Sequence, residues 1–115
     1  MTLFNIDDTR RATGSGLGDV FKQHLSAVYV NLGKGYLRRE NSARAIDALR
    51  LAHKLAPGRP QIAAALSSAY TALALSEEKR GDEGIEALNQ ALEVDPNNVE
   101  ALRLATKLAV DRDGS

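Results

Sequence analysis

Residues 29–57 read YVNLGKGYLRRENSARAIDALRLAHKLAP. Apolar side chains recur in this stretch at steps of three and four residues, first up to Leu37 and then again over 45–55. This spacing is typical of amphipathic α-helices, which bury one face. The polar residues 40–42 separate the two patterns, and Pro57 ends the second one because proline cannot continue a helix. The stretch therefore predicts two consecutive helices joined by a short turn.

Similar patterns cover most of the 115 residues on either side of this stretch. The first helix extends back to Asp19, a residue type that commonly caps helices, and Pro60 begins a third helix. No segment alternates apolar and polar residues with a period of two, so strands are not expected. We therefore expect an all-α fold of about five helices. Their apolar patterns run over residues 20–37, 45–55, 62–73, 85–94 and 99–109.

The chain also repeats itself along its length. The segment 32–36 returns thirty-four positions later as 66–70, and the segment 45–57 returns thirty-nine positions later as 84–96. Five residues are therefore inserted in the second copy, between Tyr70 and the start of the segment 84–96. A period of this length is typical of arrays of helical hairpins, in which each unit packs on the next. The positions that carry the repeat are Tyr29, Leu32, Gly33, Tyr36, Ala45, Leu49, Ala52 and Pro57 in the first copy, and Leu66, Tyr70, Leu88, Ala91 and Pro96 in the second.

This pattern resembles the tetratricopeptide repeat family, whose unit of about thirty-four residues pairs two antiparallel helices and ends in proline. The first copy fills all eight signature positions of the family. The second copy is looser, with Ser67 in place of the signature glycine and Gly84 in place of an alanine, and a final half-repeat follows Pro96. The resemblance covers about residues 26–110 and implies a right-handed superhelix of antiparallel helix hairpins.

Packing explains why small residues stand at some of the signature positions. Where two helices cross closely, bulky side chains do not fit between their backbones. We expect Gly33 and Ala45 to lack bulk at the crossing of the first hairpin, with Tyr36 and Leu49 filling the space beside them. A leucine at position 33 is then expected to overpack the crossing.

The resemblance also implies where a partner would bind. In the family, the first helix of each hairpin lines a concave groove that accepts a peptide or helix of another protein, so we expect this chain to be an adaptor, scaffold or chaperone. Short bacterial members that hold subunits of secretion machines are the more specific comparison. The carboxylate-clamp pattern of the family is matched only by Arg103 and Lys107, so that clamp is not expected. The groove positions are Ala27, Val30, Lys34, Leu37, Gln61, Ala64, Ser68, Thr71, Glu100, Arg103 and Lys107, of which Lys34, Arg103 and Lys107 carry the charges that would converge on a carboxylate.

Two and a half repeats are few for an array of this kind, since about three are needed to bury a continuous core. Something is therefore expected to cover the ends. The apolar stripe with Val20, Phe21 and Leu25 on the first helix fits either a cap on the array, together with Phe4 and Ile6, or the seam of a homodimer.

Charge is distributed unevenly along the chain, although its formal net charge is +0. Residues 1–59 contain ten Lys and Arg against five Asp and Glu, and residues 60–115 contain five against ten, so the halves carry about +5 and −5. This asymmetry favours head-to-tail association or a charged partner at one end, unless the two solvated surfaces simply differ. A self-assembling homo-oligomer is therefore the alternative function. A pI of about 6.7 argues against a nucleic-acid partner.

The residue types needed for catalysis are scarce. The chain has no cysteine and only two histidines, His24 and His53, neither of which has a second histidine at a metal-ligand spacing. The acidic pairs lie in the N-terminal tail or near the insertion, where carboxylates are normally solvated. We therefore expect no catalytic site, no cofactor and no metal, and no enzymatic activity.

The remaining segments set the expected domain boundaries. We expect a flexible arm over residues 1–18, the helical repeat domain over 19–111 and a polar end over 112–115. The apolar stretches are too short to span a membrane, and no basic segment followed by an apolar one resembles a signal peptide. The expected location is the cytoplasm.

Overall fold

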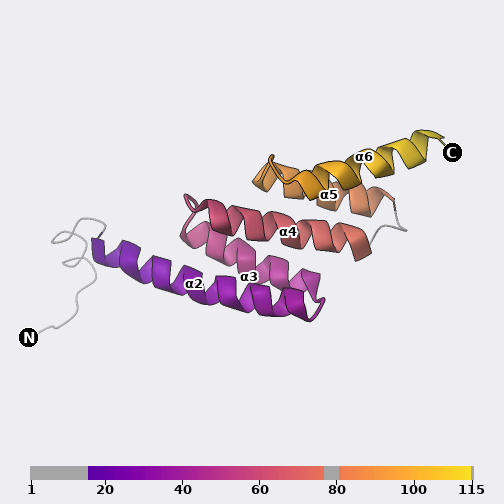
Figure 1. Ribbon diagram of the computed structural model, residues 1–115. Helices are drawn as coiled ribbons and strands as arrows, with labels where there is room; N and C mark the ends of the chain where they lie inside the picture. The colour runs from indigo at the N-terminus through magenta and orange to yellow at the C-terminus, as the bar shows by residue number, and fades with distance from the viewer. Residues whose placement is uncertain (1–15, 77–80, 115) are drawn as a thin grey trace, which may run out of the picture.

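The computed structural model describes residues 16–76 and 81–114, and all the regular structure within them is helical. The all-α fold predicted from the sequence is confirmed, as is the packing of neighbouring helices into hairpins; the handedness of the superhelix stays a prediction. The helices, labelled as in Figure 1, are α2 (Gly16–Arg38), α3 (Ser42–Leu55), α4 (Pro60–Ser76), α5 (Asp82–Val94) and α6 (Val99–Gly114).

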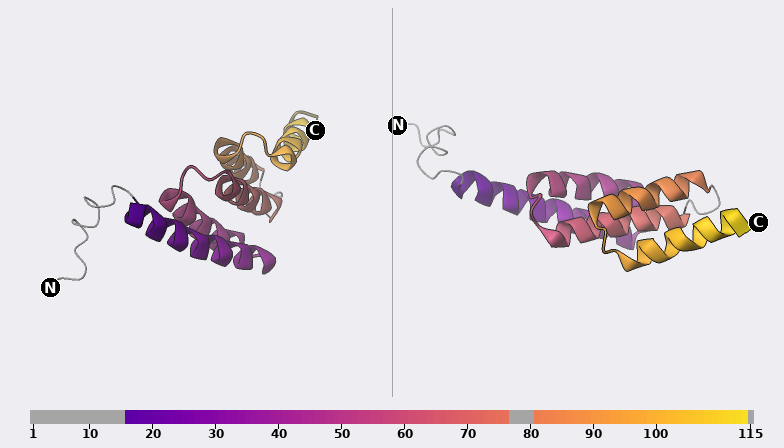
Figure 2. Two further views of the ribbon diagram at one scale, coloured as in Figure 1. Left: turned by 60° about the vertical axis from the view of Figure 1, so that its left-hand side comes forward. Right: turned by 90° about the horizontal axis from the view of Figure 1, so that it is seen from above.

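The helices form an extended array rather than a closed bundle (Figures 1 and 2). Helix α2 packs extensively on α3, and α4 on α5, so that each pair is a hairpin. The two hairpins join through α3 and α4, and α6 packs less extensively on α5. Helix α4 also contacts both α2 and α6, so these three helices form one layer of the array.

Helices α3 and α5 pack against this layer, and the core between them and the layer is built mainly from alanine and leucine. The largest fully buried apolar side chains are Leu49 and Leu88, one on the second helix of each hairpin. Buried alanines such as Ala45, Ala69 and Ala91 surround them and let the helix backbones approach closely. The predicted core positions of the second helices are therefore confirmed.

The crossing of the first hairpin is as tight as the sequence predicts. A Cβ atom built on Gly33 would lie 2.6 Å from Leu49 Cγ, closer than carbon atoms normally approach. On the same helix, a Cβ on Gly35 would meet nothing nearer than Arg38 Nη2 at 3.8 Å. Gly33 is therefore required by the packing of α2 on α3, and Gly35 is not.

The second hairpin differs from the first in its register. Helix α4 continues to Ser76, four residues beyond the counterpart of the last residue of α2, so part of the five-residue insertion is helical. The Ser67 hydroxyl, at the position equivalent to Gly33, donates to the Ala91 carbonyl at 2.7 Å. In the first hairpin, the equivalent carbonyl of Ala52 accepts instead from Ser26, seven residues before Gly33. The insertion therefore lengthens α4 and shifts α5 along it.

Two predicted boundaries are wrong. Helix α2 begins at Gly16 rather than at Asp19, which lies in the first turn, where its carboxylate is favourable for the helix dipole. Residues 16–18 thus belong to the helix, whereas the rest of the predicted arm, residues 1–15, lies outside the described residues. At the other end α6 reaches Gly114, because no proline or earlier glycine interrupts its polar last turn.

The turn between α2 and α3 contains the one non-glycine residue with a positive φ among the described residues. Glu40 has φ 58°, and its N–H donates to the Leu37 carbonyl while that of Asn41 donates to Tyr36. These two bonds define the Schellman end of a helix, in which the left-handed residue is usually glycine because a Cβ is strained there. The turn is therefore formed at the cost of local strain at Glu40.

Replacing Glu40 with glycine is expected to raise the free energy of unfolding by about 1 kcal/mol, because it removes that strain. Thermal or urea unfolding measures the change. Arg38→Gly is the matched control, since it places glycine in the last helical turn and is expected to destabilise by up to about 1 kcal/mol. Equal effects of the two substitutions would contradict the prediction.

Candidate partner-binding surfaces

The predicted groove corresponds to the layer formed by α2, α4 and α6. Most of its predicted residues are exposed on these helices: Ala27, Lys34, Gln61, Ala64, Ser68, Glu100, Arg103 and Lys107. Val30 and Leu37 are only partly exposed, because they pack against the core. The accessible side chains of this face are therefore small or polar on α4. The two outer helices add the basic side chains of Lys34, Arg103 and Lys107.

Thr71 does not line this surface, so its assignment to the groove is wrong. Its side chain is 1% exposed, and its hydroxyl donates to the Ser67 carbonyl at 2.9 Å. The Asn98 amide, from the turn before α6, donates to the Thr71 hydroxyl at 3.3 Å. Thr71 is thus covered by the segment that leads into the last helix.

The three basic groove residues come from the two outer helices of the layer. Helix α4 lies between α2 and α6, which make no contact with each other within the described ranges. Because packed helix axes are about 8–10 Å apart, the axes of α2, which carries Lys34, and α6, which carries Arg103, are roughly 16–20 Å apart. Arg103 and Lys107 are one turn apart on α6 and form the second basic edge.

A polar network that the sequence did not reveal joins α4, α5 and α6. The Asn98 Nδ2 atom donates to the Ser67 hydroxyl at 2.8 Å, in addition to Thr71, and its Oδ1 atom accepts from the Ala101 N–H at 3.1 Å. Ser67 in turn donates to α5. Asn98 therefore both caps α6 and fastens it to α4. The only local signal was an asparagine directly before a helical pattern, which predicts a cap but not the tertiary contacts.

The outward side of α2 presents a row of apolar side chains, here called the α2 stripe: Phe21, Leu25, Val28 and Leu32. Phe21 is 67% exposed and Val28 59%, while Leu25 is half-buried. The other side of α2 faces α3, so the described helices leave most of the stripe exposed. The structure thus leaves open a face that the sequence predicted to be covered by a cap or a dimer partner.

A shallow depression adjoins the stripe between α2 and α3. It measures about 200 Å³ and includes Leu32 and Tyr36 from α2 and Arg44, Asp47 and Leu51 from α3. Leu51 is 45% exposed, which extends the apolar surface onto the second helix. Apolar surface that continues over two helices is a common feature of protein–protein contact sites.

Helix α6 carries a second open face, here called the α6 stripe: Val99, Leu102, Thr106 and Val110. Val99, Leu102 and Val110 are exposed, whereas Ala101, Leu104 and Leu108 on the other side are buried. Helix α6 thus uses one side to cover the second hairpin and leaves the other uncovered.

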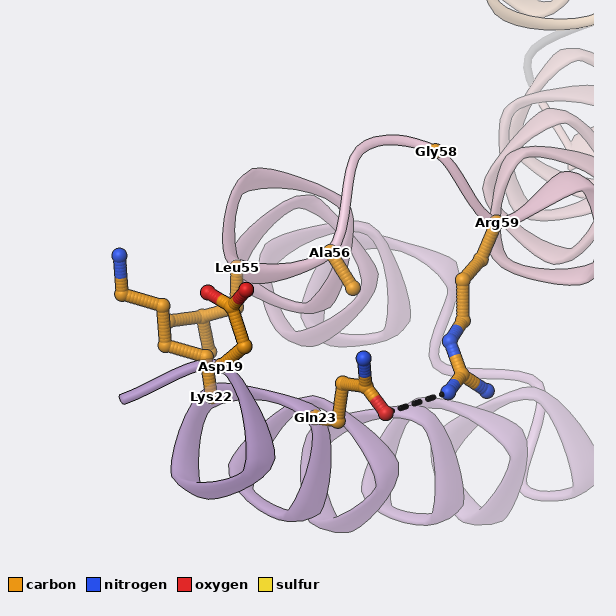
Figure 3. A pocket seen from close by; sticks show the side chains of 7 residues that line it. All are labelled: Asp19, Lys22, Gln23, Leu55, Ala56, Gly58 and Arg59. Carbon is orange, nitrogen blue, oxygen red and sulfur yellow. Dashed lines mark hydrogen bonds between the residues drawn. The ribbon is translucent and has the colours of Figure 1, made fainter. Parts of the chain in front are cut away.

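Another depression lies between the start of α2 and the turn that joins α3 to α4 (Figure 3). It measures about 280 Å³ and is lined by Asp19, Lys22, Gln23, Leu55, Ala56, Gly58 and Arg59. One guanidinium nitrogen of Arg59 donates to the Gln23 side-chain oxygen at 3.0 Å, which ties the turn to α2. The charged side chains of this depression are exposed, and Arg59 extends towards Gln23, so the depression is a feature of the hairpin junction.

The two histidines lie on different helices. His24 Nδ1 is 2.9 Å from the Val20 carbonyl oxygen on the same helix, and His53 Nδ1 is buried on α3 without a hydrogen-bond partner. Across residues 16–76 and 81–114, no group of His, Asp or Glu has the geometry of a metal site. None of the described helices combines the length and the hydropathy that spanning a bilayer requires.

Comparison with known proteins adds no assignment to these surfaces. No model of a protein family matches the chain, and no curated protein matches it either.

Proposed function

We propose that this chain is a protein-interaction module of the tetratricopeptide type that binds an acidic peptide or helix of a partner protein across α2, α4 and α6. The observation that supports it is the position of small exposed residues between two basic edges. Ala64 and Ser68 on α4 leave room for a partner backbone, while Lys34 stands on one side and Arg103 with Lys107 on the other. A segment long enough to cross α4 reaches both edges.

The mode of binding follows from the chemistry of this face. Its apolar area is small, so main-chain contacts over α4 position the partner and carboxylates on the partner pair with the basic edges. Each exposed ion pair contributes about 0.5–1 kcal/mol, which makes the interaction moderate and sensitive to salt. Such binding suits an adaptor, scaffold or chaperone in the cytoplasm. A chaperone for a subunit of a bacterial secretion machine is the finer form of the proposal, and it rests on the resemblance alone. We propose no catalytic activity.

The test uses the purified protein as bait to capture partners, followed by titration of the captured protein. We expect the double variant Lys34→Glu/Arg103→Glu to weaken binding by about tenfold or more, since two attractive ion pairs become repulsive. The matched control is Lys22→Glu/Lys54→Glu, which makes the same charge change outside the proposed face and is expected to alter affinity less than twofold. Binding that withstands the first pair of substitutions would refute this groove.

Self-assembly is the second candidate, and the charge distribution favours it. Described residues 16–59 contain eight Lys and Arg against three Asp and Glu, whereas 60–76 and 81–114 contain three against eight. The first group therefore has a net charge of +5 and the second a net charge of −5. The basic hairpin of α2 and α3 thus lies at one end of the array and the acidic segment at the other (Figure 1). Opposite ends of two copies therefore attract each other.

Light scattering at low and high salt checks this second candidate. We expect a mass above the 12.4 kDa of one chain at low salt and a shift towards that value in about 1 M salt, where charges are screened beyond about 3 Å. A mass of one chain under both conditions would exclude self-assembly and leave the groove free for a foreign partner.

A further inference from the structure

The two ends of the array each leave an apolar helix face uncovered. We propose that the α6 stripe of one copy packs on the α2 stripe of a second copy, so that the chains associate head to tail. This inference rests on the second candidate function, self-assembly, and names the surfaces that would carry it.

The α2 stripe has the composition of a packed surface. Val28 and Leu32 occupy positions equivalent to Ile62 and Leu66 on α4, thirty-four residues later. On α4 these side chains are only 4% and 3% exposed, because α3 lies against them, whereas Val28 and Leu32 are 59% and 46% exposed. The same positions therefore bury apolar side chains wherever another helix is available to cover them.

The α6 stripe is open for a corresponding reason. Leu102 occupies the position of Tyr29 in the first repeat, which is half-buried in its hairpin. Helix α6 has no such hairpin partner within the described residues, and Leu102 is 47% exposed. The missing neighbour of α6 is a helix with an apolar side, and α2 of a second copy provides one.

The two stripes match in length and spacing. Phe21 to Leu32 and Val99 to Val110 are each twelve residues long, and their eleven steps extend about 16 Å along a helix. The residues of both rows follow at steps of three and four, with Thr106 as the one polar member, so the rows can interlock as two packed helices. Each stripe can therefore be covered over its whole length by the other.

Charge selects this pairing over the symmetric ones. Contact between two α2 stripes would bring together two hairpins with a net charge of about +5. Contact between two α6 stripes would bring together two helices without net charge, each packed beside the acidic α5. Only the contact of α2 with α6 places the basic hairpin of one copy near the acidic α5 of the next. Such a contact uses different surfaces on the two copies, so it continues from chain to chain unless a ring closes.

Single charges placed in the stripes test the proposal. Val28→Asp blocks the α2 stripe and Leu102→Asp blocks the α6 stripe, and both positions are exposed, so neither change disturbs the core. We expect the wild-type protein to form oligomers whose mass rises with concentration, and each variant alone to remain at the 12.4 kDa of one chain. Val20→Asp is the matched control, because Val20 is an exposed valine of α2 outside the stripe, and this variant is expected to assemble like the wild type.

The decisive measurement is an equal mixture of the two blocked variants. Each retains one intact stripe, so a head-to-tail contact gives a complex of two chains that cannot grow further. Oligomers that persist in Leu102→Asp alone would assign the contact to two α2 stripes, and oligomers that persist in Val28→Asp alone would assign it to two α6 stripes; either result overturns the proposal. If both variants assemble like the wild type, self-assembly stands but uses other surfaces. A wild-type protein that stays monomeric refutes both this inference and self-assembly, without bearing on the groove.

Discussion

Replacing Gly33 with leucine is expected to prevent α2 from packing on α3, and even alanine at this position is expected to lower the free energy of unfolding by about 2 kcal/mol. The first added carbon would lie 2.6 Å from Leu49 Cγ and 2.9 Å from its Cδ2. Leu49 is fully buried, so in a close-packed interior it moves only by displacing neighbouring core side chains. The overlap therefore outweighs the gain of up to about 1 kcal/mol that alanine normally brings to a helix interior. Urea unfolding followed by circular dichroism measures the loss.

Gly35→Ala is the matched control for this prediction, since it changes the same residue type on the same helix where 3.8 Å of space is available. It is expected to stabilise the protein by up to about 1 kcal/mol. The double variant Gly33→Ala/Leu49→Ala is expected to lose less stability than the sum of its single changes, because removing the leucine relieves the overlap. Equal stability of the Gly33→Ala and Gly35→Ala proteins would show that the crossing is not tight.

Replacing Asn98 with alanine is expected to cost about 2–3 kcal/mol and to loosen α6 selectively. The change removes the cap of α6, which contributes about 1 kcal/mol, and two hydrogen bonds to hydroxyls of α4, which contribute about 1 kcal/mol each. The two hydroxyls belong to Ser67 and Thr71, both about 1% exposed or less, so water does not easily replace the lost donor. Helix α6 has fewer other contacts than the hairpins have.

Amide hydrogen exchange distinguishes this local effect from general unfolding. We expect faster exchange along α6 in Asn98→Ala, with the amides of α2 and α3 still protected. Asn98→Asp separates the two roles of the side chain, because aspartate caps a helix well but cannot donate to the hydroxyls. The free energy of unfolding is therefore expected to fall about half as much in Asn98→Asp as in Asn98→Ala. A stability for Asn98→Ala within about 0.5 kcal/mol of the wild type would mean that packing alone holds α6 in place.

The helices and their order could be predicted because their determinants are local. The step of three and four residues, the prolines at 57, 60 and 96 and the polar breaks act within a few residues of the chain. The Gly33–Leu49 crossing was predicted as well, since the repeat placed a residue without a side chain opposite a large one. Errors arose at the ends of the first and last helices, where residues 16–18 and 112–114 carry only weak signals for helix or coil.

The candidate surfaces were predicted less well, because exposure depends on neighbours distant in the sequence. Thr71 has the helical position of a groove residue, yet the turn at Asn98 covers it. The five-residue insertion was visible in the sequence, but only the hydrogen bonds of Ser26 and Ser67 to equivalent carbonyls revealed that it shifts the second hairpin. The separation of Lys34 from Arg103 likewise follows from α4 lying between their helices.

The sequence by itself determined that this chain forms amphipathic helices, where they break, which residues can meet at a close crossing and how charge divides between its halves. The tertiary structure alone decided which apolar faces are buried. Leu32 and Leu66 are the same residue at equivalent positions, yet one is 46% exposed and the other 3%. The difference arises because Leu66 lies in the core formed with α3, while Leu32 lies only at the edge of a shallow depression beside α3. Periodicity specifies which side of a helix is apolar, but burial requires a second surface that only the folded array provides or leaves open to another chain.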